Sequence, residues 1–449
     1  MSIIIPANSA ASGGFEVSNS LRFDKESSAY LNKTLGTPTL TTKNTISVWF
    51  KKTRLGSPSQ GLVFANGNAG GINLDSTELL QLYNAGGALK PNRVFRDTSA
   101  WYHVVVATDT TLNTADDRLK MYINGVQETS FQARTNPSQN AASSLGSATA
   151  HVIGCNNDPA NYSSGYMSEC VFIDGTALDP TSFGEFDEDS GIWKPKSVSG
   201  LTFGNNGFYL KFGNSGALGT DSSGAGNTFA VNNLDSTNQS TDTCTNNFCI
   251  LNPLMAGTAS LTYTEGNLKI VFGASGTWYF TTSTIAAIQG KWYCEVKIDA
   301  VGGETSVGII PMETVALQQN SPSDYMGKES NSIGYVNNGQ LYKTNSVQQS
   351  TSSYTTNDII GIAFNLDGNS IQFYKNGSSV GNAIALTSGL NYVVGVSGYN
   401  SSTQSVNFGS PSYAISSGNT DGNDHGNFEY SVPSGHLALC TKNLSEVDS

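Results

Sequence analysis

The chain has 449 residues, of which only 13% are charged, against roughly 25% in an average soluble protein. Its formal net charge is −12, and its 23 lysines and arginines form no basic run. Because nucleic acids are bound through clustered cations and a membrane span needs a long apolar stretch, we expect neither nucleic-acid binding nor membrane insertion.

The composition predicts an all-β protein with many tight turns. Glycine occurs 48 times, and Asn, Ser and Thr are frequent throughout the chain. Gly and Asn accept the positive φ angles that tight turns between strands require. No window combines the apolar spacing of a helix with the residues that helices favour, so we expect no long helix.

The first β-rich block follows a short start and extends from about residue 14 to residue 213. Residues 1–6 lack the basic region and the apolar core of a signal peptide, so we expect none. Runs of β-branched and aromatic residues bounded by turn residues predict strands. In this block these runs are residues 20–23, 45–51, 79–83, 101–108, 118–123, 150–153, 167–173 and 207–212.

The second β-rich block begins near Leu261, after a stretch of residues 214–260 that is rich in Gly, Ser, Asn and Thr. That composition predicts an irregular connector. The second block has predicted strands at residues 268–272, 278–280, 291–298, 305–310, 332–336, 340–343, 358–365, 370–375, 392–397 and 405–408. We therefore predict two domains, residues 1–213 and residues 261–449, the latter ending in a closing segment.

The two blocks share a local pattern of strand, loop, strand and Asn-Gly turn. In the first block the turn is Asn124-Gly125, and in the second it is Asn376-Gly377. Asn-Gly is the preferred centre of a type I′ turn, which joins antiparallel strands. The pattern indicates either a related antiparallel sandwich in both blocks or two independent uses of a common hairpin.

Several segments of the first block resemble the laminin-G-like, concanavalin A-like jelly roll. The resemblance covers roughly the first 210 residues and implies a β-sandwich of two antiparallel sheets. The segments that carry it are residues 46–51, 101–106, 120–125, 153–154, 165–167 and 172–175.

The second block resembles a SPRY domain, another concanavalin-like sandwich used for recognition. The matching segments occur in the order expected for that family. They are residues 290–296, 306–309, 332–335, 358–367 and 371–377. Together, the two resemblances imply an all-β fold of two tandem concanavalin A-like jelly-roll β-sandwiches.

A third resemblance is to structural proteins of marine tailed phages. It rests on residues 1–8, 20–23, 182–185, 191–196, 245–248 and 251–254. It implies a fibre, spike or head-decoration component located on the virion. Its partners would be other virion proteins, within an oligomer or a larger assembly.

Six cysteines offer no clear disulfide or zinc pattern. Cys294 lies inside a strand-like run, and Cys170 and Cys440 lie among apolar residues, which favours buried thiols. Cys244 and Cys249 are close in sequence, but their spacing matches no standard zinc knuckle and no second pair with histidine supports one. We expect unpaired structural cysteines.

The sequence gives little support for catalysis. Glycoside hydrolases of the concanavalin-like fold place carboxylates at alternate positions of one strand. The nearest candidates are Glu185, Asp187 and Asp189, but Ser190 and Gly191 follow at once and the pattern of a hydrolase strand is missing. The four histidines lie in no triad context. We expect no enzyme, with a glycan depolymerase as the least favoured alternative.

No cofactor is expected, although calcium is an option that the laminin-G-like resemblance raises. Hard cations such as calcium take six to eight oxygen ligands. Asp109, Asp116 and Asp117 lie between two predicted strands and could contribute. Aspartates in an exposed turn are the commoner explanation.

Ligand binding is the function that the sequence favours most. Sugars are bound by aromatic faces, with Asn, Asp and backbone groups contacting the hydroxyls. Predicted loops supply such residues, namely Tyr162, Tyr166, Tyr325, Tyr342, Tyr399 and Asn400. Since the chain has 19 tyrosines, each of these could instead cover a core edge. We expect either a virion protein that recognises host-surface glycan or a purely structural decoration protein.

Overall fold

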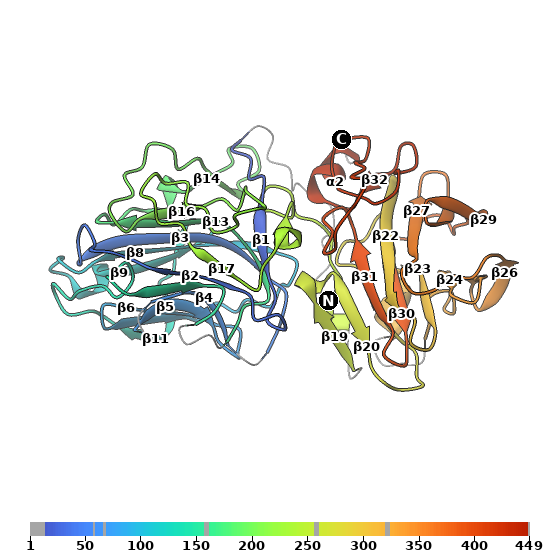
Figure 1. The fold of residues 1–449 in the computed structure, drawn as a ribbon, viewed down its shortest axis with the longest axis horizontal. Helices are drawn as coiled ribbons and strands as arrows, with labels where there is room; N and C mark the ends of the chain where they lie inside the picture. Colours follow the sequence, from blue (N-terminus) through green and yellow to red (C-terminus); the bar gives the residue numbers. More distant parts are fainter. Residues whose placement is uncertain are drawn as a thin grey trace. The chain divides into compact units, whose positions relative to one another are not determined.

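The computed structural model describes residues 14–56, 59–65, 69–156, 161–255, 260–318 and 324–447. This part of the chain divides into two compact units, one ending at Asn246 and the other beginning at Asn247. Each unit is a β-sandwich of antiparallel sheets (Figure 1). Each predicted strand is present, with its ends within two residues of the expected positions. The all-β, tandem-sandwich prediction is therefore confirmed.

The first unit consists of two eight-stranded sheets and a small hairpin. Sheet A contains, in spatial order, β10 (Val126–Gln127), β9 (Leu119–Ile123), β8 (Trp101–Asp109), β3 (Lys43–Lys52), β13 (Gly165–Asp174), β1 (Ser20–Phe23) and β18 (Gln239–Ser240), with β16 (Phe208–Leu210) beside β13. Sheet B contains β11 (Phe131–Thr135), β7 (Gly87–Pro91), β6 (Leu80–Asn84), β5 (Gly70–Leu74), β4 (Gln60–Ala65), β12 (Ala150–Ile153), β2 (Tyr30–Thr34) and β17 (Ala230–Asn232). The hairpin pairs β14 (Gly184–Phe186) with β15 (Trp193–Pro195).

Alternation along the strands builds the core between these sheets. Ile46, Val48 and Phe50 on β3 belong to the core cluster, whereas Trp49 between them stacks on His103 of β8. Because successive strand residues face opposite sides, the apolar set of each strand points to one face. The core contains side chains of both sheets, as a sandwich requires.

The predicted connector of residues 214–260 is not a separate segment, because it divides between the two units at Asn247. Residues before that point complete the first unit: Leu218 and Phe229 are part of its core, and β17 and β18 extend its sheets. Asp242 accepts hydrogen bonds from Lys51 Nζ (2.8 Å) and Trp101 Nε1 (3.0 Å). Much of this polar stretch is therefore attached to the first unit by polar contacts. The amino-acid composition alone does not reveal these contacts.

The second unit consists of an eight-stranded sheet and a six-stranded sheet. Sheet C contains β19 (Leu261–Thr264), β20 (Lys269–Phe272), β31 (Thr403–Asn407), β22 (Lys291–Ala300), β27 (Ile359–Asn365), β28 (Ser370–Lys375) and β29 (Ser378–Ala385), with β32 (Leu437–Ala438) parallel to β22. Sheet D contains β21 (Tyr279–Thr282), β30 (Tyr392–Gly398), β23 (Thr305–Pro311), β24 (Ile333–Val336), β25 (Gln340–Lys343) and β26 (Ser346–Ser350). Two short helices are α1 (Met312–Gln318) and α2 (Thr441–Val447). Among the residues described, neither helix has the length and apolar character needed to cross a membrane.

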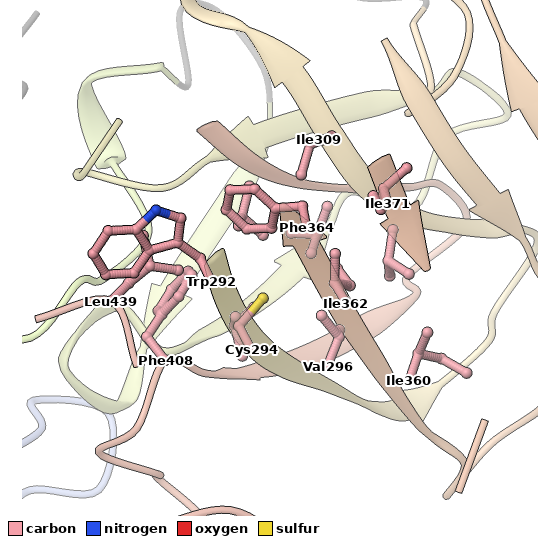
Figure 2. Close-up of a cluster of buried hydrophobic side chains, with 14 of the residues drawn as sticks. Trp292, Cys294, Val296, Ile309, Ile360, Ile362, Phe364, Ile371, Phe408 and Leu439 are labelled. Carbon is pink, nitrogen blue, oxygen red and sulfur yellow. The ribbon is translucent and has the colours of Figure 1, made fainter. Parts of the chain in front are cut away.

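The core of the second unit follows the same alternation (Figure 2). Every second residue of β22 enters it, as Figure 2 shows for Trp292, Cys294 and Val296. From the neighbouring strand β27, Ile360 and Phe364 enter the same cluster. Cys294 is buried and forms no disulfide, in agreement with its prediction as a structural thiol, and none of the other five cysteines forms a disulfide either.

A buried carboxylate holds the closing segment of the second unit against sheet C. Glu295 on β22 is fully buried and accepts hydrogen bonds from the backbone N–H groups of Glu429 (2.9 Å) and Tyr430 (2.8 Å). Burial raises the pKa of Glu295, and these hydrogen bonds oppose that shift. The polar C-terminal region is thus part of the sandwich.

Both predicted Asn-Gly turns are present and make the same contacts. Asn124 and Gly125 have φ angles of 47° and 78°, and Asn376 and Gly377 have φ angles of 50° and 78°. Each asparagine reaches back to an earlier strand, where Asn124 Oδ1 accepts from the backbone N–H of His103 (2.8 Å) and Asn376 Oδ1 accepts from that of Ile359 (2.9 Å). The equivalence extends beyond a shared turn type and supports related hairpins in the two units.

Candidate functional site

Four aromatic side chains of the second unit form a continuous row, and three of them are the tyrosines predicted to contact a ligand there. Ring centroids are 5.0 Å apart between Tyr399 and Trp278, 5.3 Å between Trp278 and Tyr325, and 5.4 Å between Tyr325 and Tyr342. Each ring is half-buried, so part of it packs while the rest remains accessible. We call these four residues the aromatic row.

Neighbouring strands of sheet D bring the row together. Strands β21 and β30 pair with Tyr279 opposite Gly398, so Trp278 and Tyr399 come together just beyond that pair. Tyr342 lies on β25, and Tyr325 lies in the segment before β24. Residues far apart in sequence thus meet because the sheet orders their strands side by side.

The segment that carries Tyr325 is fixed across the outer face of sheet D. Met326 packs with Ile310 and Val393, which point away from the main core. Its backbone N–H donates to Ser397 Oγ (3.0 Å), and its carbonyl oxygen accepts from Ser306 Oγ (2.8 Å). This approach needs a small residue beneath, because a Cβ on Gly395 would lie 2.3 Å from Met326 Sδ.

Oxygen-bearing side chains surround the aromatic row. The Tyr325 hydroxyl donates to Asn345 Oδ1 (2.9 Å), and the Tyr342 hydroxyl donates to Gln340 Oε1 (2.5 Å). Burial, followed by the nearby Glu304 carboxylate, raises the pKa of Tyr399. Burial also raises the pKa of Tyr325, with smaller effects from Tyr342 and Glu304. Both phenols are therefore protonated at neutral pH and remain able to donate and accept hydrogen bonds.

Asn400 lies at one end of the row, next to Tyr399. It is exposed, has a φ of 50°, and its backbone N–H donates to the Ser275 carbonyl oxygen (3.0 Å). Its side chain is thus presented by a tight turn rather than by a strand. The geometry brings this predicted residue to the same surface as Tyr325, Tyr342 and Tyr399.

The two tyrosines predicted in the first unit lie elsewhere. Tyr166 on β13 is only 1% exposed, and its ring lies 5.6 Å from Lys51 Nζ. This burial contradicts the prediction that Tyr166 contacts a ligand. Alternation along β13 points Tyr166 away from the core that contains Met167, and on that outer side of sheet A its ring lies beside Trp101 and Lys51. Tyr162 is half-buried and packs beside Tyr30, with ring centroids 6.1 Å apart.

Trp278 belongs to the row although the sequence pattern placed it only at the start of a strand. Its ring contacts those of both Tyr325 and Tyr399. The sequence does contain a signal for Trp278, because it directly follows the polar turn of residues 273–277. A large apolar side chain beside such a turn is expected to pack against another loop.

The acidic segment considered for glycoside hydrolysis forms the β14–β15 hairpin. Glu185 is exposed, and Lys194 Nζ lies 3.7 Å from Glu185 Oε1 and 3.0 Å from Asp187 Oδ2. The backbone N–H of Ser190, its hydroxyl and Lys194 lower the pKa of Asp187 to about 2. Asp187 therefore lacks the raised pKa that a general acid for this reaction needs.

His103 has a structural environment on β8. Trp193 Nε1 donates to His103 Nδ1 (2.9 Å), and Ser47 Oγ lies 2.7 Å from His103 Nε2. Burial lowers the pKa of His103 to about 3, which keeps the imidazole neutral. Both ring nitrogens are engaged inside the unit.

The aspartates considered for calcium each have a separate partner. Asp109 pairs with Lys43 (2.9 Å), Asp116 lies 3.4 Å from Arg134, and Asp117 pairs with Lys120 (3.0 Å). Within the described ranges, no group of three or more His, Cys, Asp and Glu side chains could hold a metal ion.

Both units match families whose domains are typically ligand- or protein-binding modules. Residues 291–411 match the family described as the SPRY domain, and residues 24–181 match the family described as the concanavalin A-like lectin/glucanases superfamily. The chain therefore contains a laminin-G-like, concanavalin A-like domain and a SPRY domain. No curated protein matches it.

Among solved structures, the chain is similar to several SPRY domains. The SPRY domain of human HERC1 is 20% identical, with 35% of this chain and 96% of that chain covered and a TM-score of 0.29. A second human SPRY domain is 21% identical, with 33% and 94% covered and a TM-score of 0.25. The PSpry domain of TRIM65 is 11% identical, with 35% and 91% covered and a TM-score of 0.28.

Proposed function

We propose that this chain is a non-enzymatic surface protein of a tailed-phage particle, a fibre, spike or head-decoration component. The second unit recognises a host-surface glycan through the aromatic row, and the first unit docks on other virion proteins. The observation that carries the proposal is the row itself, because four adjoining rings offer more than the isolated tyrosines that commonly cover a core edge.

The chemistry of the row suits a sugar polymer. Aromatic faces pack against the C–H surfaces of sugar rings, and fixed polar groups beside them select the hydroxyl pattern. Here Glu304, Gln340 and Asn345 supply oxygen acceptors next to the rings. Tyrosine and tryptophan lose little conformational entropy on binding, so a fixed row is suited to repeated contact along a chain.

Docking through the first unit is supported by the β14–β15 hairpin. Two of the segments that resemble phage structural proteins, residues 182–185 and 191–196, contribute to this hairpin. Phe186 is 50% exposed and Ile192 is 42% exposed, although both are large and apolar. Two exposed large apolar side chains on one hairpin favour a protein contact.

A binding experiment with intact host cells tests the proposal. Labelled protein is expected to bind saturably, and an excess of purified host surface polysaccharide should remove it. A Tyr325→Ala, Tyr399→Ala variant should lose this binding, whereas Phe186→Ala on the first unit should retain it. Absence of saturable binding would instead favour a structural decoration protein.

Catalysis by this chain is tested separately by incubating the protein with the same polysaccharide. The proposal predicts no new reducing ends over the time needed for binding. Release of reducing ends that disappears in a Glu185→Ala, Asp187→Ala variant would contradict it and identify a depolymerase.

A further inference from the structure

The four rings of the aromatic row face in different directions. The ring planes of Trp278 and Tyr399 meet at 67°, those of Trp278 and Tyr325 at 41°, and those of Tyr325 and Tyr342 at 78°. A flat ligand stacks on one ring face, whereas a compact, nearly spherical group can contact several faces of different direction. The tilt of the rings therefore favours a compact group as the part of the ligand that they contact.

Strand pairing brings a carboxylate, that of Glu304, to one end of the row. In the pairing of β23 with β30, Thr305 lies opposite Gly398, so the residues just beyond them, Glu304 and Tyr399, are also neighbours. The backbone N–H of Tyr399 donates to the Glu304 carbonyl oxygen (3.3 Å), and a Cβ on Gly303 would lie 2.5 Å from the Tyr399 ring. The Tyr399 ring is therefore close against the backbone that carries Glu304.

Alternation at the start of β23 points the Glu304 side chain to the outer face of sheet D. The Thr305 hydroxyl donates to that of Tyr354, which belongs to the core cluster, so Thr305 faces the core. Glu304 and Ser306 therefore face the opposite side, where Ser306 Oγ donates to the Met326 carbonyl oxygen (2.8 Å). This is the face that carries the aromatic row.

In the part of the chain that the structure describes, no lysine or arginine forms an ion pair with Glu304. Lys328, which follows Tyr325 in the same segment, pairs with Asp324 instead. Glu304 is half-buried, and its carboxylate contributes, after burial, to the raised pKa of Tyr399. A partly desolvated carboxylate without a counter-charge favours a ligand that brings a positive charge.

Aromatic rings beside a carboxylate are suited to a quaternary ammonium ion. The negative faces of tryptophan and tyrosine rings attract a cation that lies within about 6 Å of the ring centre, and tryptophan is the most effective. A trimethylammonium group has no N–H donors and is less strongly hydrated than the ammonium of lysine, so it leaves water more readily. Its compact shape also matches rings that face in different directions.

We propose that the aromatic row and Glu304 bind a trimethylammonium group carried by the host-surface glycan. The rings of Trp278, Tyr325 and Tyr399 contact the methyl groups, and Glu304 supplies the opposite charge. The net charge of −12 further favours the approach of a cationic ligand. This inference deepens the proposed function, on which only the identity of the carrier rests.

Calorimetric titration of the full chain with choline at low ionic strength tests the site. The controls are ethanolamine, which has an unmethylated ammonium group, and the neutral tert-butyl analogue of choline, which has the same shape without the charge. Choline is expected to bind, and both controls should bind at least about tenfold more weakly. Absence of choline binding, or equal binding of choline and its neutral analogue, would overturn the proposal.

Variants then assign choline binding to these residues. Glu304→Gln, which keeps the size of the side chain, and Trp278→Ala should each weaken choline at least about tenfold. Tyr325→Phe keeps the ring face and should retain most of the affinity, and Glu313→Gln, at an exposed position of α1, is the matched control. Because Glu304→Gln preserves packing, it remains informative if Trp278→Ala fails to fold. Unchanged choline binding in Glu304→Gln would contradict the proposal.

Competition separates this inference from the proposed function. An excess of choline is expected to displace bound host surface polysaccharide. Choline binding without polysaccharide binding would support the trimethylammonium site and contradict the glycan-binding function. Polysaccharide binding that Trp278→Ala removes but choline does not displace would support that function and contradict the inference. A trimethyl-lysine peptide that binds more tightly than choline would show that the carrier is a protein and overturn the assignment to a glycan.

Discussion

Glu169 is a carboxyl group inside the first unit, at a point where β13 is irregular. It has a φ of 48° and lies where the register of β13 against β3 shifts. The Tyr209 hydroxyl donates to Glu169 Oε2, and only 7% of Glu169 is exposed. Burial raises the pKa of Glu169 to about 7, although the hydrogen bond and Lys211 oppose the shift.

We expect the raised pKa to make the first unit less stable at alkaline pH. The folded state binds the proton more tightly than the unfolded state, whose pKa is near 4.5. The contribution is therefore fully present below about pH 4.5 and is lost as the pH rises through about 7. Each pKa unit corresponds to about 1.4 kcal/mol, so the loss is at most about 3.5 kcal/mol.

Urea unfolding of Glu169→Gln at pH 5 and pH 8 checks this prediction. The amide stays neutral, so the variant should lose less free energy of unfolding between the two pH values than the native protein. Equal losses in both proteins would show that Glu169 titrates normally in the folded state.

At the candidate site, the sequence predicted which tyrosines take part but not which aromatic side chains lie next to one another. Loop position and aromatic character were enough to select Tyr325, Tyr342 and Tyr399, yet nothing in sequence spacing indicated that Trp278 would link Tyr325 to Tyr399. Tyr166 failed for the opposite reason. It looked like a loop residue, but β13 begins at Gly165 and buries it.

The Asn-Gly hairpins are the elements that the two units share most clearly. In both units the turn asparagine has a positive φ and accepts a hydrogen bond from the backbone N–H of another strand. Alanine tolerates this conformation poorly and removes the acceptor. The turn therefore fixes both its own hairpin and the adjoining strand.

Asn124→Ala and Asn376→Ala should each lower the free energy of unfolding by about 2 kcal/mol, each in its own unit. The control is Asn382→Ala, whose side chain is exposed on β29. Differential scanning calorimetry of the full chain measures the effect. An effect no larger than that of the control would show that the turns are not stabilising elements.

Strand prediction worked where β-branched and aromatic residues form a run, as in β22 and β27. It missed most of sheet B, including β2, β4, β5, β7 and β11. It also missed β17 and β18, because these strands lie in the polar stretch before Asn247 and have few large apolar side chains. Their positions depend on tertiary contacts, including the buried ion pair between Asp242 and Lys51. Local sequence does not encode such pairing.

For the whole molecule, the boundary between the units is at Asn247 rather than at either end of the predicted connector. A fragment of residues 1–246 should therefore unfold cooperatively on its own. A fragment of residues 1–213 should not, because it lacks Leu218, Phe229 and Asp242, and removing one partner of a buried ion pair costs about 3–5 kcal/mol. Circular dichroism during urea titration distinguishes the fragments, and equal cooperativity would contradict the boundary.

The central claim is that the aromatic row of the second unit is the surface that binds glycan. Calorimetric titration of the full chain with purified host surface polysaccharide tests it most directly, comparing native protein, Trp278→Ala and the first-unit control Phe186→Ala. We predict that Trp278→Ala weakens binding at least about tenfold, because a tryptophan at the centre of a contact carries much of its energy. Native affinity in Trp278→Ala would contradict the claim.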